Sequence, residues 1–526
     1  MLKKLYVGSV SACFEIEETI PFDSGKHLSP YYSAIEHSVR VIEGPHVVTE
    51  FTVNTNVISL FGLKPGTMYE IHVSWENLIV FTTKKDTCAI NVKDFGAVGD
   101  GETDDTASIQ TAINCLPAGG RLFIPEGVYS IAPINLKSHI TLELAENAVL
   151  LGNTDEKRYP VIPGELTDIE TGEAVHFGTW EGNAVPMHQA LLFAEHAEDI
   201  RIVGKGTVDG NAQNSTWWVN VKDREIGRPR LIFFNRCKDI TVHGITAQNA
   251  ASWQIHPYFS QNLDFLDLTI NAPKDSPNTD ALDPEACDGV NIIGCKFSVG
   301  DDCIAIKSGK IEIGRKYKQP ADHHTIRNCI MQFGHGAITL GSEMAGGVKN
   351  LTVDRCIFNH TDRGLRIKTR RGRGKDAIID GVMFENIKMD GVLTPIVINM
   401  WYNCCDPDRY SEYNTTREKL PVDDRTPYLG RFAFQFMECL NCHVAACYCD
   451  GLPEMPIESI NIADIRFTFD PNAQPGVPAM RNNAEKMCKA GMYFDNVKKL
   501  YIRGVQIEGC EGEELLLHNV DELVRE

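Results

Sequence analysis

Three aspartates at short intervals are the residues of this chain best suited to acid and base chemistry. Asp280 closes an Asn-Thr-Asp run, and Asp301 and Asp302 follow in a Gly-Asp-Asp run. Crowded carboxyl groups repel each other's charge, which raises the pKa of one while the others stay ionised. Such a set can cleave a glycosidic bond with inversion, because one acid protonates the leaving oxygen and a carboxylate roughly 6.5–9.5 Å away activates water.

A histidine and a basic pair follow the aspartates along the chain. His335 lies between two glycines, which allow close approach of a substrate, and its ring can orient the acid. Arg366 and Lys368 are two residues apart on a predicted strand, so their side chains point to the same side. They belong to the one dense basic stretch of a chain with a formal charge of −20, and we expect them to bind a substrate carboxylate. That contact would select an acidic sugar.

The elements that carry these residues repeat. Short β-rich runs with Gly and Asn at their ends recur in steps of 23, 27, 36, 25 and 27 residues, if the equivalent positions are Ile240, Leu263, Val290, Ile326, Leu351 and Ile378. This period predicts a parallel β-helix, whose coils stack about 4.8 Å apart. The step from Asp280 to Asp301 is about one coil, so the aspartates should share one face. A leucine-rich repeat lacks support because its Leu-x-x-Leu-x-Leu frame is absent, and tight hairpins typical of a β-sandwich are scarce.

The chain divides into two parts that differ in their sequence pattern. Residues 1–88 are short alternating strands, and the run Leu63-Lys64-Pro65-Gly66-Thr67-Met68-Tyr69 resembles a fibronectin type III β-sandwich. Residues 89–526 carry the repeat, preceded by one amphipathic helix predicted over 104–116 that would cap the open end of the solenoid. Two polar insertions, 158–181 and 406–428, are expected to wall the ligand-binding face. The predicted fold class is all-β, a right-handed parallel β-helix with a small N-terminal β-sandwich.

Composition excludes several classes of protein. The acidic balance argues against nucleic-acid binding, which needs a basic surface. No stretch approaches the roughly 20 apolar residues of a membrane helix. No apolar run follows Lys3 and Lys4 as in a secretory signal, and 17 cysteines suit reduced thiols, so we expect a cytoplasmic protein. The sequence indicates no cofactor and no particular oligomeric state.

A cysteine cluster near the C-terminal end raises the alternative of a zinc site. It comprises Cys439, Cys442, Cys447 and Cys449, with Cys404 and Cys405 upstream. The spacing fits zinc only in part, and small residues such as cysteine often stack inside β-helices. We therefore interpret these residues as structural thiols and expect no metal.

The segment from about 91 to 520 resembles the polygalacturonases of glycoside hydrolase family 28. The order Asn-Thr-Asp, Gly-Asp-Asp, Gly-His-Gly, Arg-Ile-Lys is that family's signature and is present intact. The resemblance implies Asp301 as general acid, and Asp280 with Asp302 as activators of water. It implies His335 as support for the acid and Arg366 with Lys368 as ligands of the galacturonate carboxylate. It further suggests Tyr402, Asn278 and His256 as substrate-binding residues.

Within that family, the insertions and the N-terminal module resemble bacterial exo-acting members, because extra loops can close one end of a groove. We therefore expect release of galacturonic acid from the non-reducing end of oligogalacturonides. An endo-acting polygalacturonase and a rhamnogalacturonan or xylogalacturonan hydrolase remain alternatives. A pectate lyase, which would use calcium and an Arg or Lys base, is an alternative of another class, as is a non-catalytic sugar-binding solenoid.

Overall fold

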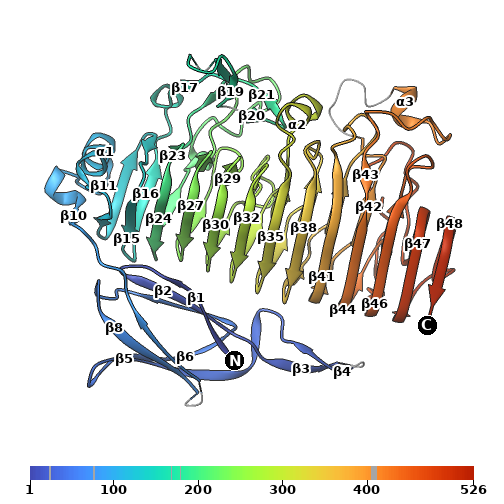
Figure 1. Cartoon of the computed structure of the whole chain (residues 1–526), viewed down its shortest axis with the longest axis horizontal. Helices are drawn as coiled ribbons and strands as arrows, with labels where there is room; N and C mark the ends of the chain where they lie inside the picture. Colours follow the sequence, from blue (N-terminus) through green and yellow to red (C-terminus); the bar gives the residue numbers. More distant parts are fainter. Residues whose placement is uncertain (23–24, 75–76, 168, 178, 404–410) are drawn as a thin grey trace.

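The computed structural model describes residues 1–22, 25–74, 77–167, 169–177, 179–403 and 411–526. A long parallel β-helix occupies most of the chain, and a small antiparallel β-sandwich lies against its flank (Figure 1). The predicted fold class is confirmed. Within the described ranges, no helix is long and apolar enough to cross a bilayer.

The sandwich consists of two antiparallel sheets with the strand orders β1-β2-β7 and β6-β5-β8-β9. Alternate residues of these strands point inward, as in β8, and Phe14, Val41 and Ile71 form its core. A hairpin of β3 and β4 extends from one end (Figure 1). The strands are β1 Leu2–Val7, β2 Ser11–Ile16, β3 Thr19–Phe22, β4 Gly25–Leu28, β5 Tyr32–Glu43, β6 His46–Thr55, β7 Val57–Phe61, β8 Met68–Val73 and β9 Asn77–Thr82.

A buried carboxylate joins the sandwich to the β-helix. Glu15 of β2 is inaccessible to solvent and accepts hydrogen bonds from Arg327 Nε at 2.8 Å and Asn328 Nδ2 at 2.7 Å, and it pairs with Arg355 at 3.2 Å. Val57 of the sandwich and Ile293 of the β-helix belong to one apolar cluster at the same interface. This contact fixes the sandwich to the coils.

We expect Glu15→Ala to destabilise the protein by about 3 kcal/mol, because the buried Arg355 and the half-buried Arg327 lose their shared carboxylate. Denaturant unfolding followed by circular dichroism measures the change, with Glu36→Ala on the exposed part of β5 as the matched control. A loss no larger than that of the control would show that the interface charges do not hold the domains together.

Three faces of parallel strands make up the coils. Face A contains β10 Ala89–Asn91, β12 Gly120–Ile124, β15 Ile140–Leu144, β24 Glu198–Gly204, β27 Lys238–His243, β30 Gln261–Leu266, β32 Asp288–Ile293, β35 Ala321–Arg327, β38 Val348–Asp354, β41 Ile378–Asp390, β43 Tyr428–Leu429, β44 Arg431–Cys442, β46 Ile457–Phe469 and part of β47 Ala490–Glu508. Face B contains β11 Asp100–Asp104, β13 Gly127–Ile131, β16 Ala148–Gly152, β25 Thr207–Asp209, β28 Thr246–Gln248, β31 Thr269–Asn271, β33 Lys296–Val299, β36 Ile330–Phe333 and β39 Ile357–Asn359, and the later long strands bend onto it.

Face C is the face that carries the predicted site. Its strands are β14 Ile134–Asn135, β23 Leu192–Glu195, β26 Ile232–Asn235, β29 Ile255–Tyr258, β34 Ile304–Ile306, β37 Ile338–Gly341, β40 Arg363–Lys368, β42 Thr394–Asn399, β45 Ala445–Asp450, the first part of β47 and the first part of β48 Leu515–Arg525. Aliphatic residues at equivalent positions of successive coils fill the interior, which gives one continuous core. The predicted capping helix is confirmed as α1 Thr106–Cys115, which buries Ile109, Ala112 and Ile113.

The register of face A differs from the predicted one at two positions. Ile240, Leu263, Val290 and Leu351 are in register, as expected. In the fourth and sixth coils, however, the equivalent residues are His324 and Val382, instead of Ile326 and Ile378. His324 is a buried histidine whose Nε2 lies 3.0 Å from the Cys287 carbonyl oxygen, so a polar residue occupies a position that we expected to be aliphatic.

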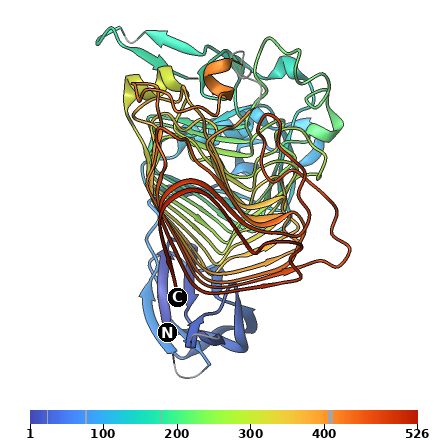
Figure 2. The same cartoon turned by 90° about the vertical axis from the view of Figure 1, so that its right-hand side faces the viewer.

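The predicted insertions leave the coil stack on the side opposite the sandwich (Figures 1 and 2). The first folds into three small antiparallel pairs: β17 Val161–Ile162 with β22 Met187–His188, β18 Glu165–Thr167 with β19 Ala174–His176, and β20 Thr179–Trp180 with β21 Asn183–Ala184. The described part of the second carries α3 Glu412–Thr415, and α2 Ile311–Tyr317 lies between the two. The remaining single turns are η1 Val92–Phe95, η2 Glu156–Arg158 and η3 Ala212–Asn214.

Candidate active site

Strand register explains how the motifs meet on face C. The inward residues Leu282, Ile304, Ile338 and Leu365 are stacked on successive coils. Asp280 and Asp302 each precede their inward residue by two positions, so they lie on adjacent coils at the same place. Arg366 follows Leu365 and Lys368 follows Ile367, so both side chains point outward, as predicted from their spacing.

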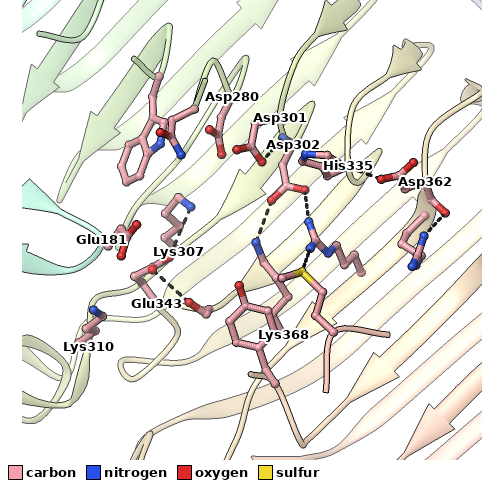
Figure 3. A pocket seen from close by; sticks show the side chains of 17 residues that line it. Glu181, Asp280, Asp301, Asp302, Lys307, Lys310, His335, Glu343, Asp362 and Lys368 are labelled. Carbon is pink, nitrogen blue, oxygen red and sulfur yellow. Dashed lines mark hydrogen bonds and ion pairs between the residues drawn. The ribbon is translucent and has the colours of Figure 1, made fainter. Parts of the chain in front are cut away.

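A cavity of about 410 Å³ opens over this stack (Figure 3). Eight of the nine predicted site residues line it: Asn278, Asp280, Asp301, Asp302, His335, Arg366, Lys368 and Tyr402. The cavity is within the size range of small-ligand sites. The residues that sequence reasoning missed are Glu181, Trp253, Lys307, Lys310, Ser342, Glu343, Asp362, Arg363 and Met480.

Asp302 is the ionised carboxylate of the cavity. Its two oxygens accept hydrogen bonds from Arg366 Nη1 at 3.0 Å and Lys368 Nζ at 2.9 Å, and its side chain is 1% exposed. Burial disfavours its charge, but Lys368 and Arg366 outweigh that effect and hold the pKa of Asp302 well below its usual range. Asp302 is thus a permanent base at neutral pH.

Asp280 and Asp301 complete a crowded trio. Oxygens of the three carboxyl groups lie within 4.8 Å of one another. Burial, together with the charges of Asp283 and Asp301, raises the pKa of Asp280 well above its usual range. The trio therefore combines a carboxylate that stays ionised with a carboxyl group that is protonated more readily than usual. Its spacing is shorter than the 6.5–9.5 Å typical of inverting enzymes, so distance alone does not predict inversion here.

His335 is held by a residue that the sequence did not single out. Its Nδ1 lies 2.9 Å from Asp362 Oδ2. This hydrogen bond raises the pKa of His335 against the effect of burial, and Asp301 and Asp302 add to the rise. The neighbouring glycine is needed for space, because a Cβ on Gly336 would lie 3.0 Å from Asp302 Oδ1 and 2.3 Å from Thr339 Oγ1. An imidazole ring held in this way beside the aspartates can orient the acid.

A buried lysine lies on the other side of the trio. Lys307 Nζ is 3.5 Å from Asp283 Oδ2, 3.4 Å from Glu343 Oε2 and 4.5 Å from the centroid of the Trp253 ring. Burial lowers its pKa, but Asp283 and Glu343 outweigh burial and raise it well above the usual range. Burial raises the pKa of Asp283 to about 7. This side of the cavity therefore has a fixed cation of its own.

Of the remaining predicted residues, two lie at the cavity and one lies behind it. Asn278 Oδ1 accepts a hydrogen bond from Arg228 Nη2 at 2.6 Å, and the Tyr402 ring centroid is 5.8 Å from Lys368 Nζ. His256 is 1% exposed, 3.0 Å from Glu285 Oε2, and packs edge-on against Trp253. The structure thus places His256 beneath Trp253 instead of at the cavity surface, because Trp253, Phe233 and Arg230 cover its ring.

Two walls flank the cavity. The first predicted insertion contributes Glu181, which Figure 3 shows on the side of Lys307 and Lys310, away from His335 and Asp362. The described part of the second insertion does not line the cavity. In its place Met480, from a segment between β46 and β47, accepts a hydrogen bond through its sulfur from Arg366 Nη2 at 2.8 Å.

Among the residues that the structure describes, the carboxylate trio is the one group close enough to share a metal ion. A calcium site needs six to eight oxygens. Lys307, Arg366 and Lys368 already supply positive charge around these oxygens. The donor set therefore suits proton transfer better than it suits a calcium ion.

The cysteine cluster occupies the coil interior as far as it is described. Cys447 and Cys449 stack between Ile396 and Ile398 on one coil and Met492 and Phe494 on the next. Cys439 and Cys442 are also buried. Cys404 and Cys405 lie outside the described residues. The four described thiols thus fill the same columns as aliphatic side chains.

Comparisons with known proteins agree with this geometry. Residues 141–418, more than half of the chain, match the family model described as "Glycosyl hydrolases family 28", and residues 89–164 match "Rhamnogalacturonase A/epimerase, pectate lyase-like". A Vitis vinifera protein named "Probable polygalacturonase" is 35% identical over 385 residues, which cover 71% of this chain and 72% of that protein.

Two solved structures share the fold. The Yersinia enterocolitica family 28 exopolygalacturonase is similar with a TM-score of 0.72 at 18% identity, over 99% of this chain and 98% of that one. The Thermotoga maritima exopolygalacturonase is similar with a TM-score of 0.63 at 25% identity, over 81% and 93%. With the four motifs gathered at one cavity and the family model matched across them, this chain belongs to glycosyl hydrolase family 28.

Proposed function

We propose that this protein is a polygalacturonase that hydrolyses α-1,4 bonds between galacturonate units with inversion. The observation that carries the proposal is Asp302, held ionised by Arg366 and Lys368 within 4.8 Å of two further carboxyl groups in an open cavity. The same two cations face the cavity and can hold a substrate carboxylate beside the cleaved bond. Acid, base and anion binder are therefore within reach of one sugar.

The roles follow from exposure and charge. Asp301 is the most exposed of the trio, so its carboxyl group can reach the leaving oxygen as general acid. Asp302 with Asp280 positions and deprotonates the water. In the free protein the raised pKa of Asp280 favours a proton among the three carboxyl groups, where the leaving oxygen needs one.

We further propose exo-action at the non-reducing end. The first insertion contributes Glu181 to one side of the cavity, and a wall there would limit the length of substrate beyond the cleaved bond. The name of the Thermotoga maritima structure, at 25% identity, agrees with this proposal. An open groove would favour internal cleavage.

The products formed early in the reaction test both the polygalacturonase activity and the exo-action. We expect galacturonic acid alone from trigalacturonate and from long polygalacturonate, whereas a ladder of oligomers from the polymer would indicate an endo-acting enzyme. Proton NMR at early times should show the β-anomer, and the α-anomer would reject inversion. An unsaturated product absorbing in the ultraviolet, lost on adding EDTA, would indicate a lyase. If the protein turned over only rhamnogalacturonan or xylogalacturonan, the proposed substrate would be wrong. If it released no reducing sugar, the alternative of a non-catalytic sugar-binding solenoid would be supported.

A further inference from the structure

We propose that Glu181 recognises the chain end, by accepting hydrogen bonds from the free 3- and 4-hydroxyls of the terminal galacturonate. This inference rests on the proposed exo-action and names the residue that enforces it. In a pyranose ring C1 and C4 lie at opposite ends. When C1 of the terminal sugar is at Asp280, Asp301 and Asp302, its C4 hydroxyl therefore points away from them, and Glu181 lies on one such side of the cavity (Figure 3).

The hairpin that carries Glu181 has a defined turn. Thr179 pairs with Ala184 and Trp180 with Asn183, so Glu181 and Gly182 form a two-residue loop. Both have a left-handed φ, 48° and 70°, which is the signature of a type I′ hairpin. The turn is tight, so the direction of the Glu181 side chain follows from the placement of the two strands.

Aromatic and cationic side chains anchor that hairpin to the coils. The Arg230 guanidinium lies 4.9 Å from the Trp180 ring centroid and 3.9 Å from that of Trp253. Arg230 Nη2 also donates to the Thr179 carbonyl oxygen at 2.9 Å. Arg230 is buried, and such cation–π contacts are strongest away from water. The hairpin is thus tied to the same Trp253 that lines the cavity.

The tip of the hairpin is seated directly on a coil. A Cβ on Gly182 would lie 2.6 Å from the Lys310 backbone nitrogen and 3.0 Å from Glu343 Cγ, so this position needs glycine for close approach as well as for its φ. In the proposed pose, a polysaccharide that continued beyond the terminal sugar would meet this contact. A wall at that place would exclude internal units sterically, and Glu181 would supply a polar contact that only a terminal sugar can make.

The chemistry of a carboxylate fits this task. Its two oxygens can accept one hydrogen bond from each of two neighbouring hydroxyls, and hydrogen bonds to a charged acceptor are about twice as strong as neutral ones. In galacturonate the 3- and 4-hydroxyls are cis, so both can face one carboxylate. A glycosidic bond at O4 removes one of these donors.

The test compares two substrates on two variants. Trigalacturonate carries the terminal 4-hydroxyl, and 4,5-unsaturated trigalacturonate lacks it. A site built to bind a hydroxyl rejects an analogue without it strongly. We expect the wild type to prefer the saturated substrate by at least about 100-fold in kcat/KM, and Glu181→Ala to reduce this preference below about tenfold. Glu173→Gln, an exposed change in the same insertion, is the matched control and should keep the wild-type preference.

The outcomes separate this inference from the proposed function. Equal losses on both substrates in Glu181→Ala would show a structural role, and an unchanged preference would show that Glu181 does not contact the hydroxyl. Either result overturns the inference while monomer release by the wild type upholds exo-action. A ladder of oligomers from wild-type enzyme and polygalacturonate would overturn exo-action and this inference together. Thermal melting of each variant checks that the hairpin remains folded.

Discussion

Asp301→Asn should lower kcat on polygalacturonate by at least about 10³-fold and leave the fold intact. General acid catalysis contributes about 10²–10⁴ to such rates, and asparagine cannot deliver the proton that the leaving oxygen requires. The change is nearly isosteric at a partly exposed position, so we expect an unchanged circular dichroism spectrum. Asp275→Asn, an exposed aspartate just upstream of Asp280, is the matched control and should retain wild-type turnover.

An activated substrate separates the acid from the base. A dinitrophenyl galacturonide has a leaving group that departs without protonation, so Asp301→Asn should recover most of its activity on it. Asp302→Asn should not recover, because the water still needs its base. If Asp280→Asn were the variant that recovered instead, the raised pKa of Asp280 would mark it as the acid, and the proposed roles of Asp280 and Asp301 would be exchanged.

The sequence predicted the trio because the spacing of the motifs matched one coil. Asp280 and Asp302 precede equivalent inward residues, so any stacking that aligns Leu282 with Ile304 also aligns the carboxylates. Arg366 and Lys368 were predictable for the same reason, since a period of two fixes their side. Local spacing therefore sufficed for the residues that lie on the strands themselves.

The register of face A has a signal in the sequence itself. The residue before each equivalent position has a left-handed φ in every one of the six coils: Asp239, Asn262, Gly289, His323, Asn350 and Gly381. Asparagine, aspartate and glycine are the residues that adopt this conformation most readily. Placing such a residue before the inward one would have selected Val382 over Ile378. His323 is a weaker signal, which explains why the fourth coil is harder to align.

The missed site residues depend on tertiary contacts. Glu181 reaches the cavity only because its hairpin folds back onto Arg230 and Trp253. Asp362 acts through His335 on the neighbouring coil. Lys307 follows a short buried strand, and a lysine at such a position is usually exposed to solvent. Here it is buried because it pairs with Asp283 and Glu343 on adjacent coils. None of these contacts is local in sequence.

The second large effect is expected at Lys368. Lys368→Met removes the ammonium 2.9 Å from Asp302 Oδ2 and one of the two proposed ligands of the substrate carboxylate. We expect kcat/KM on trigalacturonate to fall by about 10²-fold, since losing a charge-assisted hydrogen bond costs about 1.5–3 kcal/mol and a second contact weakens as well. The preference for free acid over methyl-esterified substrate should shrink in parallel. Lys375→Met, in the same basic stretch but exposed and paired with Asp424, is the matched control.

The pH profile of Lys368→Met distinguishes tuning of Asp302 from substrate binding alone. In the wild type the cations outweigh burial and keep the pKa of Asp302 well below its usual range, so the base stays ionised as the pH falls. Without Lys368, less positive charge opposes the effect of burial, so the pKa of Asp302 must rise. The acidic limb of kcat against pH should therefore move to higher pH in this variant. A limb that stayed in place, with KM alone increased, would mean that Lys368 binds substrate and does not hold the charge of Asp302.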